Sequence, residues 1–406
     1  MMTVSRIKKG SVTQTFAQKD DTLTRLKAVK YSQTLIKKRS VTPEDASCQP
    51  WLAKKLQKMG FTIELYKTQG VSNLIASFGS APTRFAFAGH TDVVPAPQPE
   101  LWQVPPFDGE IVDDELIGRG AVDMKSALAV MVAAMEDVLA SGYQPKTCWQ
   151  FLVTSDEEGE AEFGTRTIVE RLIQDDSLPD YCVVGEPTSD RNTGDVIKVG
   201  RRGAVSATII VNGKQGHVAY AGYAENAVHL ASTIVNTLEK TTWDEGCDDF
   251  PGTGLQVTYI NSGAFTDNII PGRCEICFNV RYSHRYSLAD IQEKIMNRLM
   301  ALPLSEAALQ SLDIKWERHC QPYFTQDKKQ DSLIAKAELA IHSVTGIFPR
   351  LSTSGGTSDG RFLASDTTQV LELGLPNKTI HQVNERSKLA DIHHLYHIYC
   401  ELLRQF

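Results

Sequence analysis

The chain has 406 residues, of which 42% are hydrophobic and 22% are charged, the composition of an ordinary globular protein. The length predicts one large domain or two smaller ones, with enough surface to bury a substantial core. The formal net charge of -7 argues against a general nucleic-acid binder and against attachment to an anionic membrane surface.

The sequence also argues against a membrane protein and against a disulfide-rich one. No stretch approaches the roughly 20 apolar residues needed to cross a bilayer. Eight cysteines are scattered without the spacing of a disulfide framework, so we expect reduced thiols and a cytoplasmic location. The first residues are basic and rich in hydroxyl groups but lack the apolar centre of a secretory signal. We therefore predict that residues 1–21 are an N-terminal extension.

The first half of the chain alternates between helical and extended patterns, which predicts an α/β domain built on a largely buried sheet. We expect a helix over residues 23–38, within residues 40–60 a turn followed by a helix that ends at Gly60, and a helix over residues 122–142. Strands are expected over residues 61–66, 73–79, 83–90, 146–155 and 181–186. The third helix should stop at Gly142. Its apolar side chains share one face and are Leu128, Met131, Val132, Met135 and Leu139.

The pattern changes near Gly200. A strand, a helix, two strands and a second helix are expected at residues 202–214, 226–240, 254–263, 273–283 and 288–302, which is an α+β order. The α/β pattern then returns, with a helix, a strand and a final helix at residues 332–346, 368–374 and 393–406. We predict a catalytic domain of residues 22–203 and 317–406, interrupted by a lid-like domain of residues 204–316.

Acidic and imidazole side chains follow three of the predicted strands. His90 and Asp92 end one strand, Glu157 and Glu158 follow the second, and Glu186 follows the third. In open α/β sheets, ligands bind beyond the carboxyl ends of the strands. Taken singly, the Glu157–Glu158 pair would be a charged loop and Glu186 a solvated turn, so it is their shared position that favours a site.

Two further residues extend this set. Asp123 begins the helix of residues 122–142, where alone it would be an ordinary N-cap, and His381 follows the strand of residues 368–374. Crowded carboxylates repel one another unless cations neutralise them, and carboxylates combined with histidine suit zinc or a related ion. More carboxylates than one ion requires indicate two ions that share a bridging ligand.

Other candidate features are interpreted as structural. His393, His394 and His397 include a metal-like i, i+4 pair but lie on an aromatic-rich terminal helix without a nearby carboxylate. Cys274 and Cys277 lie three apart on a predicted strand and therefore face opposite sides. We expect packing and surface roles for the histidines, and no redox or zinc site at the cysteines.

Several stretches resemble the motifs of one family, in order from about residue 22 to residue 406. They are GHTDVVP, GRGAVDMKSALA, TSDEEG, VVGEPTS, GRRGAVSATIIVNGKQGHVAY, DNIIPG, FNVRYS, SGGTSDGRF and TIHQVNE. They are similar to the dinuclear zinc peptidase and deacylase family (M20), which includes aminoacylases and acetylornithine deacetylase. The stretches RRGA, GKQGHVAY and WDEG resemble its desuccinylase branch. The resemblance implies a mixed catalytic sheet flanked by helices, interrupted by a ferredoxin-like domain that forms a homodimer.

The resemblance also implies two zinc ions per subunit, which cobalt can replace. His90, Asp123 and Glu186 would hold one ion. Asp123, Glu158 and His381 would hold the other, with Asp123 as the bridge.

Three further roles near the metal ions follow from the same resemblance. Glu157 would be the general base that takes a proton from metal-bound water. Asp92 would orient His90, as metal-bound imidazoles require. The Asp123–Met124 peptide bond is expected to be cis.

The inserted domain would complete the site. His217 would reach across the homodimer to stabilise the oxyanion of the partner's active site. The substrate's carboxylates would be bound by Arg201, Asn268, Arg281, Gly356 and Thr357. The chain departs from the family at Ala221 and Gly222, where Pro-His is usual, and in WDEGCDDFPGTG, which is usually apolar and proline-rich. Both departures concern lid closure, dimer contacts and rate rather than the metal site.

The implied activity is hydrolysis of N-succinyl-LL-2,6-diaminopimelate to succinate and LL-2,6-diaminopimelate, a step of lysine and cell-wall precursor synthesis. A related deacylase such as acetylornithine deacetylase is the nearest alternative, because the metal ligands do not contact the acyl tail. A more distant alternative is a non-catalytic metal-binding protein. The presence of Glu157 and of every metal ligand argues against this alternative. SGGTSDG lacks the lysine of a phosphate loop, so we do not expect nucleotide binding there.

Overall fold

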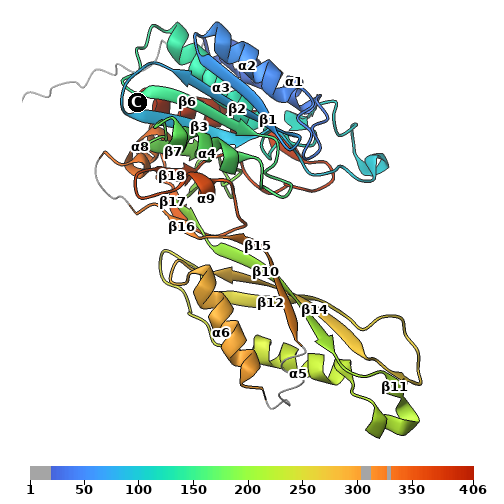
Figure 1. Ribbon diagram of the computed structural model, residues 1–406. Helices are drawn as coiled ribbons and strands as arrows, with labels where there is room; N and C mark the ends of the chain where they lie inside the picture. Colours follow the sequence, from blue (N-terminus) through green and yellow to red (C-terminus); the bar gives the residue numbers. More distant parts are fainter. Residues whose placement is uncertain (1–19, 303–311, 327–330) are drawn as a thin grey trace, which may run out of the picture.

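The computed structural model describes residues 20–302, 312–326 and 331–406, so nearly all of the predicted N-terminal extension lies outside the described residues. Two separate sheets, each with its own helices, make up a large and a small part of the molecule (Figure 1). The large part contains segments from both ends of the sequence, whereas the small part is built from its middle. This is the predicted arrangement of a domain interrupted by an insertion.

The large sheet is mixed, as predicted, and has eight strands. In spatial order they are β1 (Thr62–Thr68), β2 (Val71–Phe78), β6 (Cys148–Thr154), β3 (Arg84–His90), β7 (Tyr181–Val184), β18 (Gln369–Glu372), β8 (Val196–Lys198) and β17 (Arg350–Ser352). β6, β3, β7 and β18 are parallel neighbours at the centre. β2 pairs antiparallel with both of its neighbours.

Helices cover both faces of this sheet, so its central strands are apolar throughout. One face packs against α1 (Asp20–Ile36), α2 (Cys48–Lys58), α3 (Lys125–Ala140), α8 (Leu333–Thr345) and α10 (Leu389–Leu403). The other face packs against α4 (Thr165–Gln174) and the short α9 (Gly360–Leu363). None of the helices in the described part of the chain has the length and apolar character needed to cross a membrane.

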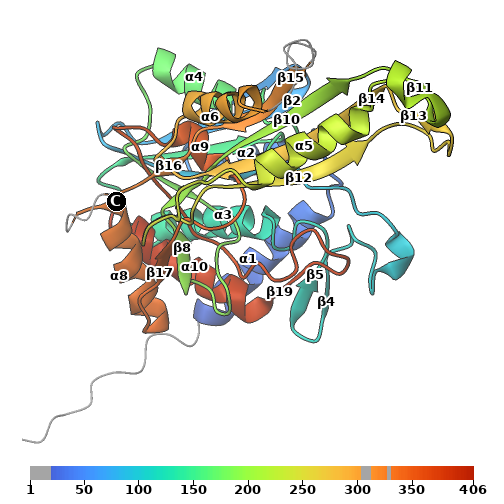
Figure 2. The same ribbon diagram turned by 90° about the horizontal axis from the view of Figure 1, so that it is seen from below.

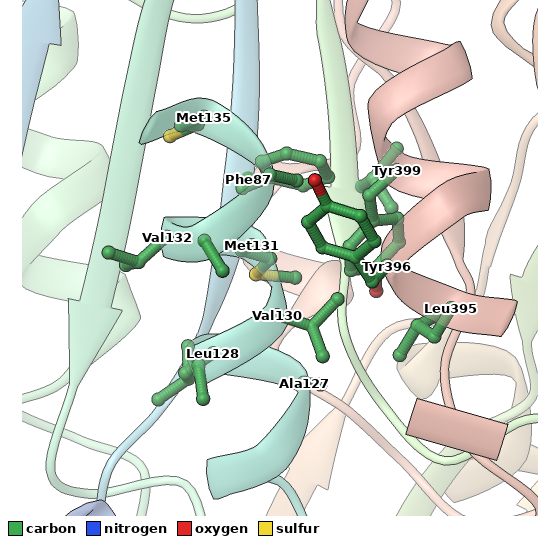
Figure 3. Packing of buried hydrophobic residues seen from close by; sticks show 14 of the residues in the cluster. Phe87, Ala127, Leu128, Val130, Met131, Val132, Met135, Leu395, Tyr396 and Tyr399 are labelled. Carbon is green, nitrogen blue, oxygen red and sulfur yellow. The ribbon is translucent and has the colours of Figure 1, made fainter. Parts of the chain in front are cut away.

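The predicted apolar face of α3 is buried, and the other sides of its first three turns are buried as well. The sheet lies on one side of α3 and the helices α1 and α10 lie on others. Figure 3 shows Val130 and Met131 of α3 among Phe87 of β3 and the rings of Tyr396 and Tyr399. The start of α3, which follows Asp123, is therefore held deep inside the large part.

The small sheet is antiparallel and has the order β12 (Gly254–Asn261), β14 (Arg273–Tyr282), β10 (Gly203–Asn212) and β15 (Asp313–Cys320). One face packs against α5 (Ala227–Glu239) and α6 (Leu288–Met300). The chain order β10-α5-β12-β14-α6-β15 is the ferredoxin-like arrangement that we expected. β15 was not predicted from the sequence, and the predicted domain boundary after residue 316 falls inside this strand.

Short strands complete the molecule. β9 (Gly200–Arg201) pairs with β16 (Tyr323–Phe324) where the two parts meet. β4 (Glu110–Val112), β5 (Glu115–Ile117) and β19 (Arg386–Lys388) form a three-stranded sheet beside the large one. β11 (Gly216–His217) pairs with β13 (Ile269–Ile270) at the end of the small part farthest from the large sheet (Figures 1 and 2).

Candidate metal centre

Three parallel strands end side by side at one edge of the large sheet. β3 pairs with β6, where His90 is opposite Thr154, and with β7, where Ala88 is opposite Val184. The loops that follow β6 and β7 therefore begin beside His90. Side chains come together at the carboxyl ends of these strands in the structure, as the sequence predicted.

His90 is the centre of a first group of possible metal ligands. Its buried Nε2 lies 3.2 Å from Asp123 Oδ1 and 3.7 Å from Glu186 Oε1. Its Nδ1 lies 2.9 Å from the backbone oxygen of Asp92, so a proton at Nδ1 leaves the lone pair of Nε2 directed at the two carboxylates. His90, Asp123 and Glu186 offer ligand atoms that all lie within 4.8 Å of one another.

His381, in the loop after β18, completes a second group. Its Nε2 lies 3.1 Å from Glu158 Oε1 and 3.5 Å from Asp123 Oδ2. Asp123 thus directs one oxygen to His90 and the other to His381, which is the geometry of a bridging ligand. The Asp123–Met124 peptide bond is cis, as the resemblance implied.

Burial and crowding shift the pKa values of these groups. Burial raises the pKa of Glu157 and of Glu186 well above the ordinary carboxyl value; the charge of Asp123 adds to this effect at Glu186. Burial alone would lower the pKa of His90, but its hydrogen bond with Asp123 raises it well above normal. Hydrogen bonding, first of all to Asp123, raises the pKa of His381 to about 10.

The donor set fits divalent metal ions. Oε1 of Glu186 is buried without a hydrogen-bond partner among the described residues, and such an oxygen is costly unless a cation lies beside it. Imidazole and carboxylate are ligands that suit zinc and related ions. Two groups that share Asp123 could accommodate two ions.

A cleft of about 430 Å³ opens beside these ligands, between the large and small parts. The residues that line it include Glu157, Glu158, Arg281 of β14 and Thr357. Gly356 precedes Thr357 in the same loop. Arg361, which was not predicted as a site residue, also lines the cleft, and its buried Nε lacks a hydrogen-bond partner among the described residues. The only sequence signal for Arg361 was its position in the motif SGGTSDGRF.

Arg201 is not directed into the cleft. Its guanidinium is buried against Glu372, with Nε 3.0 and 2.9 Å from the two carboxylate oxygens, and Nη1 donates to the backbone oxygen of Ser354 at 3.1 Å. Glu372 also accepts hydrogen bonds from Tyr323 and Ser358. In this structure Arg201 holds the loop that precedes Thr357, so its predicted contact with substrate has no support from the geometry.

His217 and Asn268 are not brought to the metal ligands of their own chain. His217 is exposed in β11, and the next residue, Val218, donates its N–H to the backbone oxygen of Asn268 at 3.1 Å. Figure 1 shows β11 at the opposite end of the small part from the large sheet. A role for these two residues in catalysis therefore requires a second copy of the chain.

The other features considered in the sequence lie outside the candidate ligand groups found in the described part of the chain. Within the described ranges, the groups that could hold a metal ion are drawn from His90, Asp123, Glu157, Glu158, Glu186 and His381. His393 and His397 pack ring against ring on α10, with centroids 4.4 Å apart. Cys274 and Cys277 are free thiols on β14.

The sequence matches curated relatives over nearly its whole length. It is 60% identical to succinyl-diaminopimelate desuccinylase 2 of Shewanella loihica, over 93% of this chain and 100% of that protein. It is 46% identical to succinyl-diaminopimelate desuccinylase 1 of Alteromonas mediterranea, over 93% of this chain and 96% of that one.

The fold matches solved structures at low sequence identity. An M20 family metallo-carboxypeptidase from Sulfolobus solfataricus superposes with a TM-score of 0.77 at 17% identity, covering 93% of this chain and 98% of that one. A dinuclear metal-binding peptidase of the M20 family from Bacillus subtilis gives 0.67 at 13% identity, with coverages of 94% and 98%. Residues 86–405 match the profile of peptidase family M20/M25/M40. The chain belongs to this peptidase family.

Proposed function

We propose that the chain hydrolyses the amide bond of N-succinyl-LL-2,6-diaminopimelate, releasing succinate and LL-2,6-diaminopimelate. The observation that carries the proposal is the joining of two ligand groups through Asp123 beside a cleft that contains Arg281 and Arg361. The names of relatives that are 60% and 46% identical support the choice of substrate.

The proposed cofactor is two zinc ions, which cobalt can replace. His90, Asp123 and Glu186 would hold one ion, and Asp123, Glu158 and His381 the other. Ions bound there would acidify a water molecule and polarise the scissile carbonyl group.

Glu157 is the proposed general base. Its carboxylate is close to His90 and Glu158, and it lines the cleft in which the scissile amide would lie. It accepts a proton from the attacking water and then gives this proton to the nitrogen of the leaving amine. One carboxyl group in this position can therefore serve both halves of the reaction.

Charged and polar groups of the cleft would bind the substrate's carboxylates. Arg281 and Arg361 present guanidinium groups, which form paired hydrogen bonds with carboxylates. Thr357 adds a hydroxyl group and Gly356 a backbone N–H. Arginines in the cleft would thus allow a protein with a net negative charge to bind a negatively charged substrate.

The active unit in this proposal is a homodimer formed through the small part. His217 and Asn268 lie far from the metal ligands of their own chain, so they would act on the site of the second copy, where His217 donates to the oxyanion. A cytoplasmic location completes the proposal, in keeping with free cysteines throughout the described residues.

The test is a hydrolysis panel with zinc-loaded protein. N-succinyl-LL-2,6-diaminopimelate, N-acetylornithine and simple N-acetyl amino acids are compared by kcat/KM. We expect the succinyl substrate to be preferred, because the arginines of the cleft need carboxylates to pair with. A preference for N-acetylornithine would instead identify the related deacetylase activity.

A further inference from the structure

Glu385 joins the loop that carries His381 to the segment that carries Asp123, and we propose that it is a positioning residue of the metal centre. It lies in the loop between β18 and β19, which also carries His381, and its side chain is completely buried. Its carboxylate contacts the segment that ends at Asp123. The inference rests on the proposed metal centre.

The carboxylate of Glu385 is fully hydrogen-bonded. Oε1 accepts the backbone N–H groups of Val122 at 2.8 Å and Asp123 at 3.1 Å. Oε2 accepts the N–H of Gly120 at 2.9 Å and Nη1 of Arg119 at 2.8 Å. Both oxygens therefore have two donors, which is the arrangement of an anion enclosed by a turn of backbone N–H groups.

This enclosure requires a tightly folded segment. Gly120 has a φ of 85°, and a Cβ atom there would lie 2.9 Å from side-chain atoms of Val93 and Lys125. The backbone of Glu385 adds another link by accepting the N–H of Gly118 at 2.9 Å. The segment before Asp123 is thus wrapped around one carboxylate from the loop of His381.

Through these contacts, Glu385 affects the distance between Asp123 and His381. Asp123 Oδ2 and His381 Nε2 lie 3.5 Å apart, although their residues come from distant parts of the sequence. Glu385 holds the backbone N–H of Asp123 and belongs to the same loop as His381. A shift of its carboxylate would move these two ligands relative to each other.

A purely structural role is the alternative, and Glu372 provides the matched control. Glu372 is also completely buried and also pairs with an arginine, Arg201. Its partners Tyr323 and Ser358 carry none of the proposed metal ligands. The charge of Glu372 acts on Glu186 of the first group, so loss of its carboxylate should lower stability without changing the binding of the ion held by the second group.

The experiment titrates Zn²⁺ and Co²⁺ into metal-free wild-type, Glu385→Gln and Glu372→Gln proteins. The amide group introduced by Glu385→Gln would point a donor at two existing donors. We expect the affinity for the ion held by Asp123, Glu158 and His381 to fall by about 10–100-fold, with altered absorption bands of bound Co²⁺. Glu372→Gln should unfold at lower temperature but bind the ion of the second group like the wild type.

Wild-type metal affinity and Co²⁺ absorption in Glu385→Gln would overturn the inference, whatever happens to the unfolding temperature. If that variant does not fold, Glu385→Asp is titrated instead, because it keeps the charge but is too short to hold both loops. Unchanged metal binding in folded Glu385→Asp would overturn the inference equally. The titration needs no substrate, so a protein that binds two ions without releasing succinate counts against the proposed reaction alone.

Discussion

The carboxylate of Asp92 accepts a hydrogen bond from the backbone N–H of Glu158 at 3.0 Å, and a second from that of Glu157 at 3.3 Å. Its link to His90 runs mainly through the backbone. His90 Nδ1 lies 2.9 Å from the backbone oxygen of Asp92 and 3.5 Å from its side-chain oxygen. The side chain of Asp92 therefore holds the acidic turn after β6 more closely than it holds the imidazole.

Asp92→Asn should lower kcat more than it lowers metal content. The amide would point a donor at one of the two N–H groups of the turn, whereas the backbone contact that orients His90 stays in place. We expect a fall of about 10–100-fold in kcat per bound metal. Metal analysis and steady-state kinetics on the same sample check this. Loss of metal with an unchanged kcat per loaded site would show that the side chain mainly orients His90.

Glu157→Gln should bind two ions and yet lose most of its turnover. The amide can occupy the same space but cannot accept a proton, so kcat should fall by about 10²–10⁴-fold. Glu170→Ala, an exposed position on α4, is the matched control and should keep wild-type activity. A near-normal kcat in Glu157→Gln would remove this residue from the proposed mechanism.

The candidate metal centre was predictable because chain order alone brings strand ends together. His90, Glu158 and Glu186 follow parallel strands, so their proximity needed no knowledge of packing. Glu385 was not predictable in the same way, because its partners are backbone N–H groups of a distant segment. No pattern of residue types indicates which backbone groups a buried carboxylate will contact.

The features of the fold that were not predicted from the sequence have similar physical causes. α3 carries the predicted apolar face, but alanine and valine on its other sides also pack closely. The periodicity of a helix shows which side is most apolar, not how many neighbouring elements surround the helix. β15 reads DIKWERHC, in which charged residues obscure the alternation of a strand whose side chains are mostly partly or fully exposed. Arg201 lies in a family motif, yet its partner Glu372 is remote in the sequence.

Mixing two inactive variants should restore activity if His217 acts on a second copy of the chain. His217→Ala should retain both ions and the dimer but have a lowered kcat, because a donor to the oxyanion is lost. A mixed dimer of His217→Ala and Glu157→Gln contains one site with both residues intact. We expect co-refolded mixtures to exceed the activity of either variant alone. No gain in the mixture would mean that His217 does not act across the dimer.

Arg201→Met should destabilise the protein by about 3–5 kcal/mol, because it leaves the buried Glu372 carboxylate without its ionic partner. Burial alone would raise the pKa of Glu372, but Arg201 lowers it below the ordinary carboxyl value. A lowered folded-state pKa adds stability above the unfolded-state pKa, and this stability is lost as pH falls through the folded-state pKa.

The advantage of wild type over Arg201→Met should therefore be present at neutral pH and shrink in acid. Urea unfolding at several pH values measures it. A loss below about 1 kcal/mol at neutral pH, the contribution of an exposed ion pair, would mean that Arg201 is free to bind substrate as first predicted.

Arg361→Gln should weaken the recognition of one substrate carboxylate. The buried Nε of Arg361 lacks a partner among the described residues, and the side chain lines the same cleft as Arg281. A hydrogen bond to a charged group contributes about 1.5–3 kcal/mol, so kcat/KM should fall roughly 10- to 150-fold.

Nα-succinyl-lysine lacks only the carboxylate at the free-amine end of the proposed substrate, so Arg361→Gln should lower its kcat/KM much less. Arg404→Gln, exposed at the end of α10, is the control and should alter neither value. Equal losses for both substrates would mean that Arg361 does not bind that carboxylate.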